Sequence, residues 1–207
     1  MAMICREQRL LFIFAPHTGS TAIGTLLRDQ FGGEWIPAAD VKGPDGKWVR
    51  RKHTTEPELM RAGLLPTGER GKLLAFSAVR NPFDTLVSVY LKHSVKDQAL
   101  LEKPEAWVHG RKRKLDNLEF CRDHTFDEWI EHIHGPRLRD RLRGRKANLS
   151  RWLHDEGMDV VMRYETLQAD FDVVLTKAGI EGHHEIPKEN VTSARAGRDY
   201  RTFYSKR

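Results

Sequence analysis

Three short apolar segments stand out along an otherwise polar chain. Residues 10–14 read Leu-Leu-Phe-Ile-Phe, residues 72–79 form a second apolar stretch, and residues 159–162 form a third. Continuous apolar runs of this length are typical of strands buried on both faces of a parallel sheet. Weaker β-type patterns surround Trp35 and Trp48. We therefore expect three core strands and two short peripheral ones.

Helical patterns separate and follow these strands. The predicted helices span residues 23–31, 54–63, 83–91, 125–135, 149–156 and 167–178. Their apolar residues recur at helical spacing, or their ends carry capping residues, glycine or proline. Residues 94–118 are polar, and we expect a mobile excursion there. Strands that alternate with helices predict an α/β fold with a central parallel sheet flanked by helices. Ligands of such sheets bind beyond the carboxyl ends of the strands.

A turn-rich loop, Pro16-His-Thr-Gly-Ser-Thr21, lies between the first core strand and the first helix. The N–H groups at a helix N-terminus and the helix dipole favour an anion. Gly19 lets a ligand approach the backbone closely, and Ser20 and Thr21 add hydroxyl donors. The spacing is not that of a Walker A motif. Phosphate binding and ordinary capping of a helix are both compatible with these residues.

The most specific stretch is Ala78-Val-Arg-Asn-Pro-Phe-Asp-Thr-Leu-Val-Ser-Val-Tyr90. Arg80 ends the second core strand, and Ser88 lies in the following helix on the same side as Asp84. A guanidinium can form paired hydrogen bonds to a phosphate, and a serine hydroxyl can donate a further hydrogen bond to the same phosphate. The alternative interpretation is a strand end followed by a helix cap.

Together these segments resemble sulfotransferases that use 3′-phosphoadenosine 5′-phosphosulfate (PAPS), particularly the carbohydrate-type enzymes and their bacterial relatives. The loop is similar to the family's P-[KR]-[ST]-G-[ST]-[ST] pattern, with matches at Pro16, Thr18, Gly19, Ser20 and Thr21 and a departure at His17. The second stretch resembles V-R-[ND]-P-x-[DE]-x-x-x-S-x-Y. The resemblance implies a single P-loop-like domain over residues 1–207. It also implies that the loop binds the 5′-phosphosulfate and that Arg80 and Ser88 bind the 3′-phosphate.

The acceptor side of the site is implied by a third segment. This segment reads Arg51-Lys-His-Thr-Thr-Glu-Pro-Glu-Leu59. It is similar to the K-H-x-T-x-x-E-L segment of carbohydrate-type sulfotransferases. The resemblance implies that His53 takes the proton of the acceptor, a role that suits imidazole because its ordinary pKa lies near neutrality. Lys52 beside it is a candidate to hold the acceptor or to stabilise sulfate charge.

Two later segments extend the resemblance to the end of the chain. Residues 163–167 resemble the family's R-Y-E-x-L turn, which we interpret as structural, with a position of Glu165 facing the cleft as the alternative. Residues 190–204 look like the late segment that closes over the nucleotide in relatives, and there Arg195 and Arg198 are the implied contacts to the 3′-phosphate.

His17 is the departure that matters most for the implied reaction. In-line sulfuryl transfer leaves negative charge on the oxygen that bridges to the 5′-phosphate, and a cation aimed at that oxygen lowers the barrier. The family carries Lys or Arg at this position. Three interpretations remain: cationic His17 is the donor, Lys52 or an arginine replaces the missing cation, or the chain binds PAPS with little or no transfer. We favour the first.

The net charge of the chain favours certain classes of ligand but does not identify one function. The net charge is +6, which favours anionic ligands. Basic runs at residues 111–114 and 137–146 are typical of solvated faces, or could hold an acidic acceptor. Nucleic acid is not expected, because no known binding motif or interleaved aromatic residues accompany these basic runs.

A P-loop kinase would need a Walker lysine and an acidic magnesium ligand, and neither is found in place in the sequence. The alternative we retain is a non-catalytic nucleotide- or polyanion-binding protein.

The remaining features set the expected surroundings. Cys5 and Cys121 are the two cysteines, and neither lies in a metal-binding or C-x-x-C pattern. We therefore expect no metal site and a cytoplasmic protein. The longest apolar run, residues 10–15, is too short to span a bilayer. The product would be adenosine 3′,5′-bisphosphate, and the expected acceptor is a glycan, a glycolipid or a small metabolite.

Overall fold

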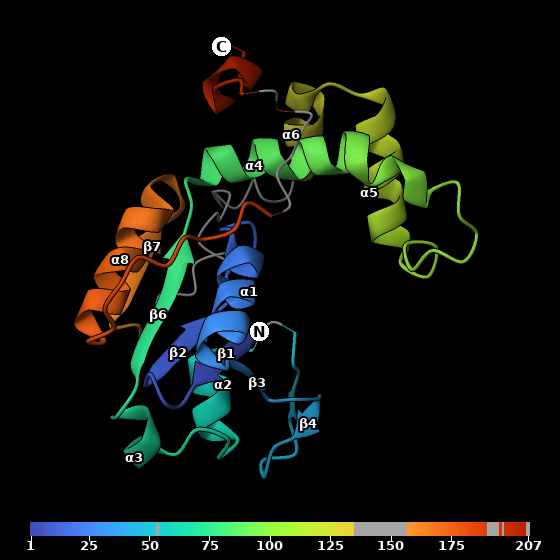
Figure 1. Ribbon diagram of the computed structural model, residues 1–207. Helices are drawn as coiled ribbons and strands as arrows, with labels where there is room; N and C mark the ends of the chain where they lie inside the picture. Colours follow the sequence, from blue (N-terminus) through green and yellow to red (C-terminus); the bar gives the residue numbers. More distant parts are fainter. Residues whose placement is uncertain (53, 135–156, 190–194, 196, 206–207) are drawn as a thin grey trace, which may run out of the picture. The chain divides into compact units, whose positions relative to one another are not determined.

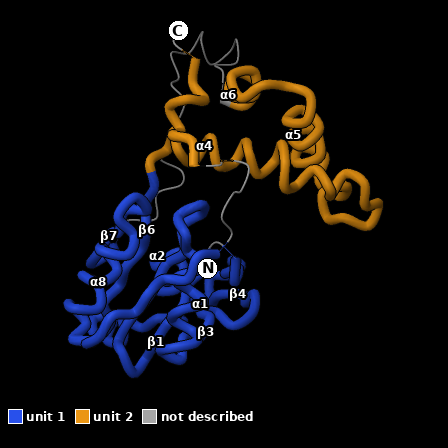
Figure 2. Tube along the Cα trace, turned by 45° about the horizontal axis from the view of Figure 1, so that its top comes forward, with its two compact units in different colours: residues 1–80, 152–190 blue, residues 81–151, 191–207 orange. Residues whose placement is uncertain are grey.

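The computed structural model describes residues 1–207 except 53, 135–156, 190–194, 196 and 206–207. The chain divides into two compact units, which Figure 2 colours separately. Unit 1 comprises Met1–Arg80 and Trp152–Asn190, and unit 2 comprises Asn81–Arg151 and Val191–Arg207. Three sequence predictions fall outside the described residues: the role of His53, the basic run 137–146 and the helix 149–156.

Unit 1 is built on a five-stranded sheet with the order β3-β1-β2-β6-β7 (Figure 1). Its strands are β1 (Ala2–Cys5), β2 (Leu10–Ile13), β3 (Glu34–Ile36), β6 (Leu74–Val79) and β7 (Val160–Arg163). A separate hairpin pairs β4 (Val41–Lys42) with β5 (Trp48–Val49). The three core strands predicted from the sequence are confirmed as β2, β6 and β7, which run parallel.

The sheet is mixed, whereas the sequence predicted a parallel one. The strand β1, which the sequence analysis missed, pairs antiparallel with both β2 and β3. Only four residues join β1 to β2, and the N–H of Arg9 closes this turn on the carbonyl of Arg6 at 3.2 Å. A connection this short can only join antiparallel strands, since a parallel crossover needs a dozen residues or more. The α/β fold itself is confirmed.

Helices cover both faces of this sheet. The helices of unit 1 are α1 (Ser20–Phe31), α2 (Glu56–Arg61), α3 (Thr67–Arg70) and α8 (Leu167–Lys177), and a 3₁₀ turn spans Tyr164–Thr166. On one face Phe12 and Phe76 pack with residues of α1 and α8. On the other face Leu11 and Ala75 pack with Leu59 of α2. Alternate residues of β2 thus serve two apolar clusters, which explains its continuous apolar sequence.

The strand register brings three carboxyl ends to one edge of the sheet. Ile13 at the end of β2 pairs with Ser77, and Val79 at the end of β6 pairs with Arg163 at the end of β7. The hydroxyl of Ser77 donates to the Ile13 carbonyl at 2.8 Å and adds a side-chain bond to this ladder. The segments that follow these strands therefore begin at a common edge.

Unit 2 is helical in its described residues. It contains α4 (Pro82–Leu91), a π-helical turn (Lys92–Lys96), a 3₁₀ turn (Gln98–Leu100), α5 (Lys112–Asp123), α6 (Phe126–His134) and a last 3₁₀ turn (Tyr200–Phe203). The segment 94–118, for which a mobile excursion was expected, contains short turns and the start of α5. Helix α5 buries Leu118 and Cys121, and its Asn117 accepts a 2.9 Å bond from the indole of Trp129.

Two features of the described residues bear on membranes and metal ions. No helix there has the length and apolar character needed to cross a bilayer. No group of three or more His, Cys, Asp or Glu side chains in that part of the chain is placed to hold a metal ion. Both cysteines are buried, and burial raises the pKa of Cys5 and of Cys121 to about 12.

Candidate active site

The loop after β2 is held together by its own hydroxyls. Thr18 and Ser20 are buried, and both donate to the carbonyl of Ala15, at 2.9 Å and 2.5 Å. Their oxygens lie 2.7 Å apart. These two hydroxyls therefore hold the loop in shape from the inside. The Thr21 side chain, by contrast, is exposed at the first turn of α1.

The loop presents backbone at the start of α1. Gly19 is the N-cap of α1, and no side chain caps the helix there. His17 and Gly19 have φ values of 65° and 75°, in the left-handed region. Histidine is among the residues that enter this region more readily than most. The first amides of α1 have no partner within the helix, and they lie at the positive end of its dipole. This backbone can receive an anion.

The segment after β7 packs directly on the loop. A Cβ added at Gly19 would lie 2.9 Å from Cδ2 of Leu167 and 3.5 Å from the ring of Tyr164. Glycine is therefore favoured here by its φ, and a side chain at this position would also make the end of Leu167 shift. The 163–167 turn thus lies against the loop, which explains its structural role more closely than the sequence did.

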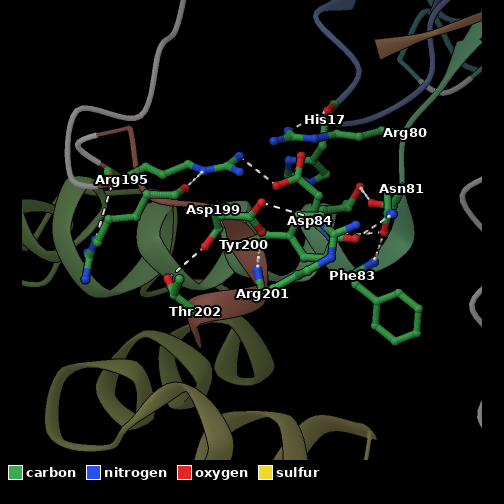
Figure 3. Close-up of polar contacts among 12 residues, drawn as sticks. His17, Arg80, Asn81, Phe83, Asp84, Arg195, Asp199, Tyr200, Arg201 and Thr202 are labelled. Atoms are coloured by element: carbon green, nitrogen blue, oxygen red, sulfur yellow. Dashed lines mark hydrogen bonds and ion pairs between the residues drawn. The ribbon is translucent and has the colours of Figure 1, made fainter. Parts of the chain in front are cut away.

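Arg80 joins the same assembly. Its Nη1 donates to the carbonyl of His17 at 3.0 Å (Figure 3), and its guanidinium carbon lies 4.1 Å from the ring centre of Tyr164. A guanidinium stacked on an aromatic ring is stabilised by a cation–π interaction and is held in one orientation. Three segments singled out in the sequence, the loop 16–21, Arg80 and the turn 163–167, therefore meet at one edge of the sheet in unit 1.

The other predicted phosphate ligands lie in unit 2 and are described within it. Ser88 is half-buried on α4. Arg195 and Arg198 share one turn, which the N–H of Arg198 closes on the Arg195 carbonyl at 3.0 Å. Within the same unit, Nη1 of Arg195 lies 2.6 Å from Oδ1 of Asp84 (Figure 3).

Comparison with protein families decides the class of the chain. A model described as the sulfotransferase family matches residues 1–206. The chain belongs to the sulfotransferase family. A search of curated proteins and a search of solved structures each returned no match. The family predicted from the three motifs is confirmed, and membership supports sulfuryl transfer as the general activity.

The structure describes the residues predicted for the donor more fully than those predicted for the acceptor. Lys52 is exposed, and His53 lies outside the described residues. Motif matching predicts no role for Tyr164, Leu167 or Asp84, although all three lie within segments that resemble the family. Their importance depends on contacts with distant residues, which a motif does not reveal.

Proposed function

We propose that this sulfotransferase moves a sulfuryl group from PAPS to a hydroxyl or amine acceptor. The observation that carries the proposal is the meeting of the loop 16–21, Arg80 and the turn 163–167 at the carboxyl edge of the sheet. Unpaired helix amides and an oriented guanidinium are the chemistry that phosphate and sulfate esters require. The family match over residues 1–206 supports sulfate as the transferred group.

The proposed roles follow the resemblance residue by residue. The backbone of the loop, with Thr18, Gly19, Ser20 and Thr21, receives the 5′-phosphosulfate. Arg80, Ser88, Arg195 and Arg198 are assigned to the 3′-phosphate. Because the hydroxyls of Thr18 and Ser20 bond to Ala15, we assign them to shaping the loop and leave direct contact to the backbone and Thr21.

The proposed transfer is in line. The acceptor oxygen or nitrogen forms a bond to sulfur while the bond from sulfur to the bridging oxygen breaks. The electron pair stays on that oxygen, and the product is adenosine 3′,5′-bisphosphate. His53 takes the proton of the acceptor, and Lys52 holds the acceptor or stabilises sulfate charge. His17 is an exposed residue of the loop, and its cationic imidazolium stabilises the negative charge on the leaving oxygen.

The proposed acceptor is a glycan, a glycolipid or a small metabolite, and the proposed setting is the cytoplasm. A second candidate function is binding of a nucleotide or polyanion without turnover. One observation favours it, namely that His17 stands where related enzymes carry a permanent cation. The two functions share the nucleotide site and differ in whether sulfate leaves PAPS.

Ligand choice tests the proposed donor. Adenosine 3′,5′-bisphosphate should raise the melting temperature of the full chain, because a ligand that binds only the folded state stabilises it by about 3 kcal/mol at a hundred times its Kd. ATP with Mg²⁺ should give a much smaller shift, since it lacks the 3′-phosphate. The measurement is a thermal-shift titration of both ligands. Equal shifts with both nucleotides, or none with either up to millimolar concentration, would contradict the proposal.

Substitutions of His53 and His17 should have different effects on turnover. His53→Ala is expected to lower turnover of PAPS by about 100-fold or more while nucleotide affinity stays within about twofold, because a general base acts only in the transition state. His17→Ala should also lower turnover. Because a neutral His53 and a cationic His17 are both required, the wild-type rate should rise and then fall with pH, and the fall should reflect loss of the His17 imidazolium. The assay is release of adenosine 3′,5′-bisphosphate between pH 6 and 9. His109→Ala, an exposed histidine of unit 2, is the control.

A rate that is flat with pH, combined with a near wild-type His17→Ala, would remove His17 from the mechanism and leave Lys52 or an arginine as the cation. Loss of nucleotide affinity in His53→Ala would make His53 a binding or folding residue. Absence of turnover in the wild-type chain, with nucleotide binding intact, would favour the second candidate function.

A further inference from the structure

The C-terminal segment of the chain is fastened to the first turn of α4 within unit 2. The amide of Asn81 donates to the Tyr200 hydroxyl at 3.2 Å, and the Tyr204 hydroxyl donates to the carbonyl of Phe83 at 2.9 Å. The ring of Tyr204 also lies 4.8 Å from that of Phe126, edge to face. These contacts hold residues 199–204 in place on either side of one helix turn, and Asp84 lies in that turn.

Asp84 is the buried member of this arrangement. It is 5% exposed, and its Oδ1 lies 2.6 Å from Nη1 of Arg195. Burial of a carboxylate is costly unless it is paired, and the ion pair with Arg195 supplies the opposite charge. The position in the first turn of α4 adds the favourable field of the helix dipole. A folded chain therefore has a strong reason to keep Arg195 at this point.

The turn that carries Arg195 holds a second arginine beside it. Nε of Arg195 donates to the carbonyl of Arg198 at 2.8 Å, and Gly197 supplies a φ of 75° within the turn. The guanidinium of Arg198 lies 4.5 Å from the ring of Phe203. Among the contacts of the described residues, Arg195 uses Nη1 toward Asp84 and Nε toward this carbonyl. Arginine has five N–H donors, so the rest of its fork remains to bind an anion.

We propose that Asp84 is a positioning residue for the donor nucleotide, which fixes the fork of Arg195 for the 3′-phosphate. This inference rests on the proposed function. The ion pair that compensates the buried charge of Asp84 also fixes the direction in which the Arg195 guanidinium points. Orienting Arg195 before the ligand arrives lowers the ordering cost of binding, and the gain appears in affinity for the nucleotide.

A double-mutant cycle tests the inference. Binding of adenosine 3′,5′-bisphosphate is measured by isothermal titration for the wild-type chain, Asp84→Asn, Arg195→Ala and the double variant. Asp84→Asn is expected to raise Kd about tenfold, which corresponds to about 1.4 kcal/mol. In the Arg195→Ala background the same substitution should have almost no effect, because Asp84 acts through Arg195. In turnover assays Asp84→Asn should raise KM for PAPS with little change in kcat.

Two further variants complete the test. Asp116→Asn removes the same charge from an exposed position on α5 and should bind like wild type. Asp84→Glu keeps the buried charge but displaces it by one methylene. It should therefore weaken binding even if Asp84→Asn does not fold.

Two results would overturn the inference while leaving the proposed function intact: wild-type affinity in both Asp84 variants, or an effect of Asp84→Asn that persists without Arg195. Failure of the wild-type chain to bind the nucleotide would instead refute the proposed function, and this inference with it.

Discussion

Replacement of Arg80 by alanine is expected to weaken binding of adenosine 3′,5′-bisphosphate by about 100-fold or more, since each hydrogen bond to a charged group contributes about 1.5–3 kcal/mol. The stacked guanidinium of Arg80 is already oriented over Tyr164, so little ordering cost offsets the bonds it makes to a phosphate. Isothermal titration of the variant beside the wild-type chain measures the loss. The thermal shift with the nucleotide should disappear in parallel.

Part of the expected loss of nucleotide affinity comes from a change in the loop 16–21. Arg80 donates to the carbonyl of His17 at 3.0 Å, so its removal also releases one support of the backbone that we propose to receive the 5′-phosphosulfate. Arg80→Lys helps to separate the contributions. A lysine keeps the positive charge but cannot stack or form a two-pronged contact, and we expect a Kd about tenfold above wild type.

Arg28→Ala is the matched control, because Arg28 is an exposed arginine of the same unit that forms an ion pair with its neighbour Asp29. It removes the same charge far from the candidate site and should leave Kd within about twofold of wild type. If Arg80→Ala bound the nucleotide as tightly as Arg28→Ala does, Arg80 would be a structural support of the loop, and the assignment of the 3′-phosphate would be wrong.

The sequence predicted the elements whose pattern is local and strong. The strands β2, β6 and β7 are short apolar runs, although β7 lies at the end of the strand order and exposes Val161, and the helices α1, α4 and α8 carry apolar stripes. Periodicity therefore located these elements. The motif residues could be predicted because each follows one of these strands or begins one of these helices. Their order along the chain then identified the family.

The elements that the sequence missed have weak local signals. Strand β1 is four residues long and acquires its identity from pairing with β2 and β3. Helix α5 is strongly polar and buries only a narrow face formed by Leu118 and Cys121. In both cases tertiary contacts override a pattern too short or too polar to decide the structure.

The site itself shows the same limit. The motif identified Thr18, Ser20 and Asp84 as members of functional segments. It did not show that the first two hydroxyls turn inward to Ala15, or that Asp84 meets Arg195. A residue's type and spacing indicate what chemistry it can perform, whereas the partner that it uses is decided by residues far away in the sequence.

Arg70→Met is expected to lower the free energy of unfolding by about 3–5 kcal/mol, because it leaves a buried carboxylate without its cation. Arg70 and Glu56 have side chains that are 15% and 8% exposed, and Nε of Arg70 lies 2.9 Å from Oε1 of Glu56. The same guanidinium donates to the carbonyls of Leu73 at 3.0 Å and Gly157 at 2.7 Å. It also lies 3.2 Å from the carboxylate of Asp159.

This arginine stabilises the strand that supports the candidate site. Gly157 and Asp159 lead into β7, and Asp159 also accepts a 2.7 Å bond from the N–H of Ala75 in β6. The end of β7 carries the turn that packs on the loop at Gly19. We therefore expect loss of Arg70 to reduce nucleotide affinity in the protein that remains folded, in addition to its effect on unfolding.

Urea-induced unfolding of three variants distinguishes this mechanism from a general loss of charge. Arg28→Met, which breaks an exposed pair, should cost at most about 1 kcal/mol. Adding Glu56→Gln to Arg70→Met should recover much of the stability, because the uncompensated buried charge is then removed as well. A double variant no more stable than Arg70→Met alone would show that the hydrogen bonds of Arg70 to Leu73 and Gly157, rather than its ion pair with Glu56, hold this part of unit 1 together.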